Sequence, residues 1–239
     1  MPADLVLKAR SAACPGPVAV AAGASVVASV PAALMSWHAV YTGGPLPAAS
    51  SASSRLMYRA STEAMLRAYL EVTAGQWRAT ELYHQLETSE KAQASYRIGT
   101  ICAGVASHLG LGLPLLVHRE TLFGKSSGKR GDLLGLRGGT GDWHGVEAKG
   151  KSPKWPSGVP RYVPPAAFDH AKDQAQTLGG EIVAAQLPTG AGDHWAVTSR
   201  TSTDAALEIV LDDPPEGGGG TRPPLESDFP QEDPFERLL

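Results

Sequence analysis

The 239-residue sequence has few cysteines and lacks several widespread motifs, and each absence excludes something. Its two cysteines, Cys14 and Cys102, are too few for a disulfide framework and form no zinc-binding pattern. A reducing, cytoplasmic setting is therefore the simplest expectation. The sequence also lacks a Walker loop, a dinucleotide-binding glycine fingerprint and a nucleophile elbow. It therefore offers no motif for those nucleotide-binding and serine-hydrolase classes.

Charged side chains are missing from most of the N-terminal quarter. No Lys, Arg, Asp or Glu lies between Arg10 and Arg55, and this stretch is rich in Ala, Gly and Pro. Lys8 and Arg10 precede it, as in a secretory signal. The run over residues 17–35 is interrupted by Gly, Ser and Pro, and Ala is only marginally apolar to a bilayer. We therefore predict that residues 1–55 form a flexible arm without a membrane partner; an exported protein anchored by this arm is the alternative.

The charge of the chain is unevenly distributed. From Asp204 to Leu239, ten acids and two bases give a net charge of −8, so the preceding residues carry +5 within the total of −3. A basic body with an acidic tail fits a protein that meets phosphate backbones. Residues 213–239 are rich in Pro, Gly and acids, and we predict that they form a disordered tail. Its apolar residues could dock on a protein partner.

Periodic patterns predict helices and strands in the remainder of the chain. Residues 56–87 are expected to form a helical hairpin packed on the core, with Gly75 ending its first helix. Helical spacing of apolar residues also predicts a helix that begins near residue 88 and stops at Gly110. The anchors expected for the second helix of the hairpin are Trp77, Leu82 and Leu86. The other predicted elements are strands over 115–118, 182–187, 194–201 and 207–211 and a helix that starts after Pro164 and ends at Gly179 and Gly180.

The stretch 131–151 predicts a β-hairpin. Apolar residues occupy positions 133–136, and residues 138–142 have the Gly, Thr and Asp composition of a tight turn. The second strand is expected over 143–149. Alternate side chains of a strand share a face, so the acidic and basic residues of the second strand should point the same way.

Three charged residues of this hairpin are expected to meet. Glu147 and Lys149 share one face of the strand, and a matched hairpin brings Asp132 close to them. Two carboxylates with nearby backbone carbonyls suit Mg²⁺, which prefers oxygen ligands and keeps several waters. A bound metal lowers the pKa of water, and a neighbouring lysine stabilises developing negative charge. The pattern favours chemistry on phosphate, although Glu-x-Lys is also a common tripeptide on solvated strands.

Asp132 together with Glu147-Ala148-Lys149 resembles the signature of the PD-(D/E)xK, or restriction-endonuclease-like, nuclease superfamily. Gly131 stands where that signature often has proline. The resemblance implies an α/β (α+β) fold with an αβββαβ core and a mixed sheet over residues 88–212, with extra N-terminal helices and disordered termini. It also implies hydrolysis of phosphodiester bonds in DNA, or else RNA, by an endonuclease that depends on Mg²⁺ or Mn²⁺.

The resemblance further implies a role for each matched residue. Asp132, Glu147 and the Ala148 carbonyl would hold the metal, and Lys149 would assist the attacking water. Nucleases of this superfamily often carry an additional acid on the helix before the first strand, and Glu90 is the candidate. The alternative for Glu90 is a first-turn acid that is favoured by the helix dipole.

Six further residues are candidates for contact with nucleic acid. Two lie in the basic loop before the hairpin and two in the segment 151–162, where bases alternate with aromatics. The resemblance implies the other two, because in that fold the following helix packs beside the site and can contribute a polar group. The segment 151–162 could equally be a proline-stiffened loop. The six residues are Lys129, Arg130, Lys151, Lys154, Lys172 and Gln174.

The rival hypothesis is a catalytically inactive module that binds nucleic acid or another protein on the same fold. Its working surfaces would be the basic-aromatic segment and the acidic tail. A homodimer is compatible with either hypothesis. Metal dependence separates the two, because an inactive module binds nucleic acid in EDTA and never cleaves it.

Overall fold

The computed structural model describes residues 2–42, 51–124, 132–137, 140–151, 165–188, 194–201 and 205–212, with the backbone alone for residue 151 and residues 165–168. The acidic tail predicted over 213–239 lies outside the described residues. None of the helices in the described part of the chain has the length and apolar character that crossing a bilayer requires.

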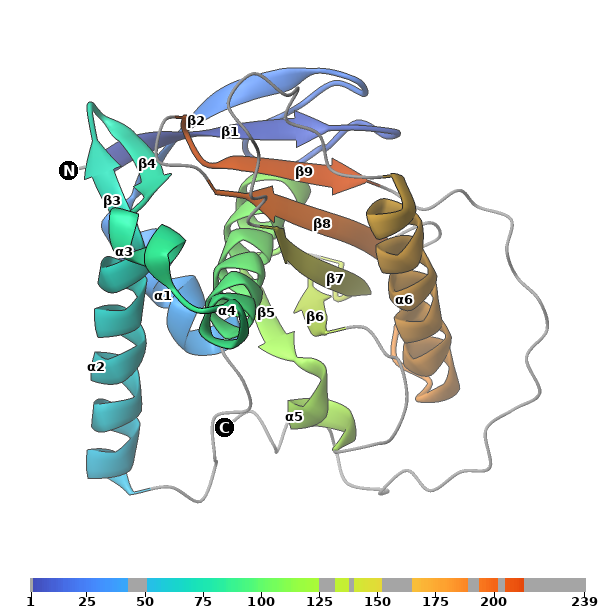
Figure 1. The fold of residues 1–239 in the computed structure, drawn as a ribbon. Coiled ribbons are helices and arrows are strands. Elements are labelled where there is room, and N and C mark those ends of the chain that lie inside the picture. Colours follow the sequence, from blue (N-terminus) through green and yellow to red (C-terminus); the bar gives the residue numbers. More distant parts are fainter. Residues whose placement is uncertain are drawn as a thin grey trace.

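The strands of the described residues form one nine-stranded sheet (Figure 1). They are β1 (Pro2–Ala9), β2 (Ser25–Pro31), β3 (Leu70–Thr73), β4 (Gln76–Ala79), β5 (Leu115–His118), β6 (Leu133–Leu136), β7 (Trp143–Lys151), β8 (His194–Arg200) and β9 (Glu208–Asp212). Their order is β3-β4-β1-β9-β8-β7-β6-β5, and β2 pairs with β1 outside this path.

The sheet is mixed, as the sequence predicts. Strands β5, β6 and β7 are antiparallel to one another, β7 and β8 are parallel, and β9 runs antiparallel to β8. β1 joins β9 in parallel. The strands predicted over 115–118, 194–201 and 207–211 are thus confirmed within a residue or two, as is the hairpin of β6 and β7.

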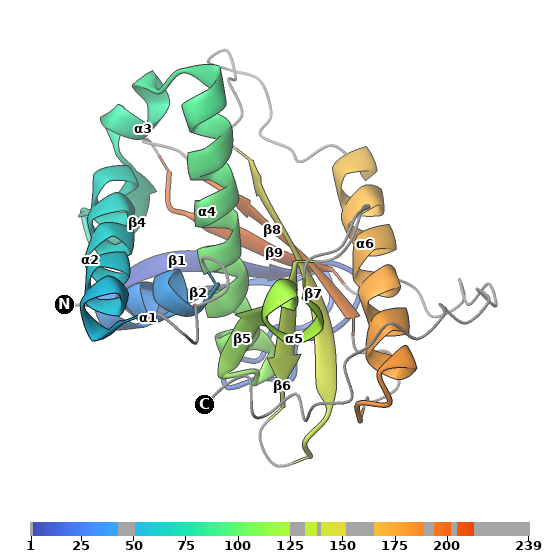
Figure 2. The same cartoon turned by 90° about the horizontal axis from the view of Figure 1, so that it is seen from below.

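Helices cover both faces of the sheet (Figure 2). They are α1 (Ala32–Thr42), α2 (Ala52–Tyr69), α3 (Glu81–Gln85), α4 (Thr88–Ala106), α5 (Arg119–Phe123) and α6 (Pro165–Ala184), and a π-helical turn, Ser107–Leu111, continues α4. α4 packs on β7, β8 and β9, whereas α6 packs on β7 and β8 from the opposite side. α1 lies against α4, and α2 lies against α1. From residue 88 the order is helix, strand, strand, strand, helix, strand, with the short α5 added.

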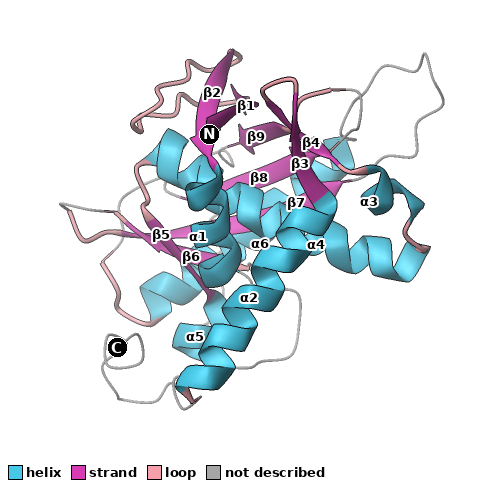
Figure 3. Cartoon of the chain, turned by 90° about the vertical axis from the view of Figure 1, so that its left-hand side faces the viewer, coloured by secondary structure: helices cyan, strands magenta, loops and turns pink. Residues whose placement is uncertain are grey.

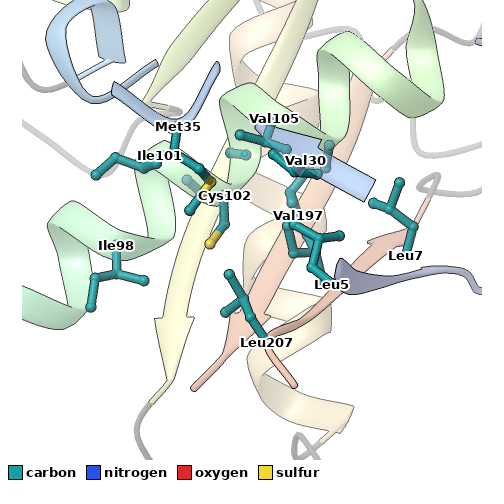
Figure 4. Packing of buried hydrophobic residues seen from close by; sticks show 14 of the residues in the cluster. Leu5, Leu7, Val30, Met35, Ile98, Ile101, Cys102, Val105, Val197 and Leu207 are labelled. Atoms are coloured by element: carbon teal, nitrogen blue, oxygen red, sulfur yellow. The ribbon is translucent and has the colours of Figure 1, made fainter. Parts of the chain in front are cut away.

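The main core lies between α4 and the middle of the sheet (Figure 4). The apolar stripe predicted for α4 is buried there and includes Ile98, Ile101, Cys102 and Val105. Val197 of β8 and strand β1 supply the opposing side chains. A second, smaller apolar cluster lies on the α6 side and contains Leu134, Trp143, Leu178 and Ile182 with neighbours from β5 and α5.

The prediction of a flexible arm over residues 1–55 is wrong for residues 2–42, because these residues contain β1, β2 and α1. β1 buries alternate residues, and Leu5 and Leu7 are fully enclosed. This alternation is that of a strand with one face in the core, so these residues belong to the folded domain rather than to a flexible arm. Part of the arm, residues 43–50, lies outside the described residues.

The prediction of a helical hairpin over residues 56–87 is wrong in its second half. The first helix, α2, ends at Tyr69, and a short β3–β4 hairpin and the five-residue α3 follow. Ala74 and Gly75 form the turn between the two strands with positive φ angles of 51° and 75°. Trp77 lies on β4, where its indole N–H donates a hydrogen bond to the Val30 carbonyl at 3.0 Å. The spacing of Trp77, Leu82 and Leu86 imitates a helix by chance.

Helix α6 does not end at Gly179 and Gly180, and the strand predicted over 182–187 is wrong for the same reason. The helix continues to Ala184 because Leu178 and Ile182 extend its buried face at helical spacing. Gly179 is required there by packing, since a Cβ at this position would overlap the imidazole ring of His194.

Two glycines allow α4 to cross directly over β7. A Cβ added to Gly150 would overlap the carbonyl oxygen of Ser95, and one added to Gly99 would overlap the backbone nitrogen of Gly150. Both contacts are with backbone atoms, which cannot rotate away. The close crossing therefore fixes the position of α4 beside the end of β7.

We expect Gly99→Ala to destabilise the protein by about 1–3 kcal/mol, the usual cost of overpacking. Gly180→Ala is the matched control, because Gly180 lies in α6 with open space around its Cβ position. In the control, the better helix propensity of Ala should stabilise the fold by up to about 1 kcal/mol. Urea unfolding measures the free energy of unfolding of both variants. Equal changes in the two variants would contradict the close crossing of α4 over β7.

Candidate active site

The register of β6 on β7 places Asp132 opposite Glu147. Leu133 pairs with Val146 and Leu134 with Gly145, so the next position outward on β6 faces the next position along β7. The strand β5 ends at the same level, because the Arg119 N–H donates a hydrogen bond to the Asp132 carbonyl at 2.9 Å. Three neighbouring strands therefore meet at this point.

Glu147 and Lys149 lie on the α6 side of the sheet, as strand alternation predicts. Gly145, two residues earlier, faces α6, where a Cβ would lie 3.2 Å from the Leu178 side chain. Ala148 points the other way and belongs to the core beneath α4. The Lys149 ammonium forms an ion pair and hydrogen bond with the Oε1 atom of Glu147.

Both carboxyl groups are withdrawn from water, and burial raises the pKa of each. Burial is the largest cause for Glu147, whose side chain is fully enclosed, and the negative charge of Asp132 raises its pKa further. For Asp132, burial again dominates, opposed by the positive charge of Lys149 and by the hydrogen bond that the Ala148 N–H donates to the carboxylate. The Asp132 N–H likewise donates to the Glu147 carboxylate.

One oxygen of each carboxyl group has no partner among the described residues. These atoms are Oδ2 of Asp132 and Oε2 of Glu147, and both are buried. Buried carboxylate oxygens without partners are costly. Two such oxygens side by side suit Mg²⁺ or Mn²⁺, because Mg²⁺ commonly takes one or two carboxylates and completes its shell with waters and substrate phosphate. The residues present therefore fit a divalent cation.

Tyr96 on α4 lies within electrostatic reach of this pair, and sequence reasoning does not single it out. Burial raises the pKa of its phenol, and the negative charge of Asp132 adds to the effect. Its hydroxyl lies 3.3 Å from Nε2 of His118. Nδ1 of His118 accepts the Glu120 N–H at 3.3 Å, so the neutral ring carries its proton on Nε2 and donates it to Tyr96. The Tyr96 hydroxyl hydrogen is then not used in this contact.

Glu90 does not join the two carboxylates. It is exposed in the first turn of α4, six residues or roughly 9 Å of helix axis before Tyr96. Among the described residues, no group of three or more His, Cys, Asp or Glu side chains could hold a metal ion. Its position at the start of the helix matches the alternative, a first-turn acid favoured by the helix dipole.

Lys172 serves a structural contact on the α6 side. Its ammonium lies 3.0 Å from Oδ2 of Asp212, a fully buried carboxylate at the end of β9. Arg10 also pairs with Asp212, at 3.1 Å, and the Ser11 hydroxyl donates to its other oxygen. The positive charges of Arg10 and Lys172 thus compensate the negative charge of the buried Asp212. In this structure the Lys172 ammonium contacts that carboxylate rather than extending to the surface.

The other predicted contacts with nucleic acid are only partly visible. Lys129, Arg130 and Lys154 lie outside the described residues. Lys151 ends β7, and its side chain is not described; Gln174 is partly buried on α6.

Comparison with family models, with curated proteins and with solved structures finds no match.

The pH dependence of stability should report the buried carboxyl pair. Because their folded pKa values are raised, the folded state keeps protons that the unfolded chain releases. In EDTA, this contribution lowers the free energy of unfolding as pH rises from the ordinary glutamate pKa, about 4.3, through the raised folded values. Glu147→Gln should flatten this decline in thermal melting, whereas Glu71→Gln, at an exposed position on β3, should leave it unchanged. An identical slope in Glu147→Gln and wild type would contradict the burial.

Lys172→Met should destabilise the protein by about 1–3 kcal/mol, because it removes one hydrogen-bonded partner from a buried carboxylate. Lys8→Met, at an exposed position near the end of β1, is the control and should be nearly neutral. Chemical unfolding measures both; a neutral Lys172→Met would show that the ion pair is dispensable.

Proposed function

We propose that the protein is a metal-dependent nuclease that hydrolyses phosphodiester bonds in DNA or RNA. The observation that carries this proposal is the pair of buried carboxylates, Asp132 and Glu147, each with an unpartnered oxygen and with Lys149 at their side. Such a pair is expensive to maintain without a function, because neither oxygen gains a hydrogen bond within the described structure.

The order of elements supports the same proposal. The resemblance to the PD-(D/E)xK superfamily implies an αβββαβ core with the acids at neighbouring strands, and α4 to β8 follow that order around a mixed sheet. Asp132 stands at the start of the second of these strands and Glu147 within the third. The resemblance thus accounts for both topology and position.

The roles of the side chains follow from their surroundings. Asp132 and Glu147 would hold the cation through their unpartnered oxygens. When bound, such a cation lowers the pKa of water and offsets charge on the phosphoryl oxygens. Lys149, partly exposed and charged, would orient the attacking water and stabilise the negative charge that develops on phosphorus-bound oxygen. The Tyr96 hydroxyl, 3.3 Å from Nε2 of His118, would donate a hydrogen bond to a phosphate oxygen at the mouth of the site.

Hydrolysis joins the water oxygen to phosphorus and breaks one ester bond. The water loses a proton to solvent or to a neighbouring base, and the leaving alkoxide gains one. The protein holds these groups in place, which is the larger part of catalysis in phosphoryl transfer.

A nuclease panel tests the proposal with single- and double-stranded DNA and RNA in Mg²⁺ or Mn²⁺. Asp132→Asn and Glu147→Gln should reduce cleavage to background, and Lys149→Ala should reduce it by roughly 10²–10³-fold. Glu71→Gln is the carboxylate control and should cleave as wild type does. EDTA should stop the reaction.

A binding measurement separates an inactive site from a wrong one. Mn²⁺ should raise the melting temperature of the wild type but not that of Glu147→Gln, because a ligand stabilises only the protein that binds it. Stabilisation by Mn²⁺ without cleavage of any substrate would favour the rival, an inactive binding module. Cleavage that survives Asp132→Asn and Glu147→Gln at the wild-type rate would exclude this site.

A further inference from the structure

A groove distinct from the carboxylate pair is lined by residues of α1 and α2. These two helices lie side by side (Figure 3). This groove has a volume of about 410 Å³, which is within the usual size of ligand sites. Its floor on α1 consists of small and apolar residues together with Trp37 and Tyr41. α2 contributes Arg59, Glu63 and Arg67.

Trp37 and Tyr41 form an aromatic shelf in this groove. They lie one helical turn apart, and their ring centroids are 4.3 Å from each other with the planes tilted by 40°. The Trp37 side chain is 46% exposed, although tryptophan is usually well buried. An exposed aromatic shelf of this kind suits the stacking of a planar ligand.

The groove is positively charged. α1 carries no Lys, Arg, Asp or Glu, and on α2 the Glu63 carboxylate pairs with Arg67 at 2.6 Å. Arg59 is exposed and has no ion-pair partner among the described residues. The shelf therefore has one uncompensated guanidinium beside it. An apolar peptide has no negative charge to pair with this cation, whereas a nucleotide carries both a planar base and a phosphate.

We propose that the α1–α2 groove binds an unpaired nucleotide of a single-stranded nucleic acid, with its base stacked on Trp37 and Tyr41 and its phosphate at Arg59. The choice of a nucleic acid rests on the proposed function, while the shelf and the free guanidinium do not. The groove is connected to the candidate active site by packing, because α1 contacts α4, which carries Tyr96, and β5, which carries His118. A single strand of nucleic acid held in the groove would extend the contact with substrate beyond the scissile bond.

The test measures the binding of a fluorescein-labelled oligothymidylate by fluorescence anisotropy in EDTA, where no cleavage occurs. Trp37→Ala should weaken binding by about tenfold, since loss of one base stack costs about 1–3 kcal/mol. Trp37→Phe keeps a stacking surface and should retain most of the affinity. Leu82→Ala, at an exposed position on α3, is the apolar control and should bind as wild type.

Arg59→Ala tests the phosphate contact. It should weaken binding and reduce the slope of log affinity against log salt by about 0.7, the value for one phosphate on a single strand. Lys8→Ala, an exposed cation on β1, controls for general charge and should leave the slope unchanged. Melting temperatures within error of wild type would show that both groove variants fold.

The outcomes separate this proposal from the nuclease proposal. Wild-type affinity in both Trp37→Ala and Arg59→Ala, or no binding of oligothymidylate by the wild type, would overturn the groove assignment even if the protein cleaves nucleic acid. Absence of oligothymidylate binding by the wild type would indicate that the groove binds a peptide or another ligand. Weakened binding by both variants would support the groove even if no nuclease activity is found.

Discussion

The pairing of β6 with β7 is the constraint on which the rest of the structure depends. Its register puts Asp132 opposite Glu147 in a place that water does not reach freely, and two neighbouring carboxylates repel each other there. Lys149 and two backbone N–H groups offset part of this cost, but one oxygen of each carboxyl group stays without a partner among the described residues. A divalent cation is the simplest group that would satisfy both. The proposed function thus rests on a local electrostatic imbalance.

The surrounding elements hold these strands in register from both sides. α4 rests directly on the end of β7 through Gly99 and Gly150, and the same helix presents Tyr96 to the site. On the opposite face, a buried ion pair of 2.6 Å between Arg119 and Glu181 connects the end of β5 to α6. Both side chains are almost fully enclosed, so this contact orders the elements at the cost of desolvation. β1 then extends the sheet on the far side of β9 (Figure 1).

The sequence predicts the centre of the protein better than its edges, for physical reasons. The β6–β7 hairpin is predictable because turn residues and a period of two are both local signals, and these fix the shared face of Glu147 and Lys149. β1 is hard to predict because it lies next to a long uncharged, Ala-rich stretch whose composition suggests a flexible arm. Tyr96 and Asp212 were missed because contacts between distant segments leave no local pattern. The ion pair of Lys172 with the buried Asp212 is another such contact between distant segments.

The most direct measurement of the central claim is the anomalous scattering of Mn²⁺ in crystals of the full chain. We expect one peak within about 2.0–2.3 Å of Oδ2 of Asp132 and Oε2 of Glu147, the range for hard cations bound by oxygen. Crystals of Glu147→Gln grown in the same solution should lose that peak. A clear map of the wild type with no peak between these two carboxylates at saturating Mn²⁺ would contradict the account.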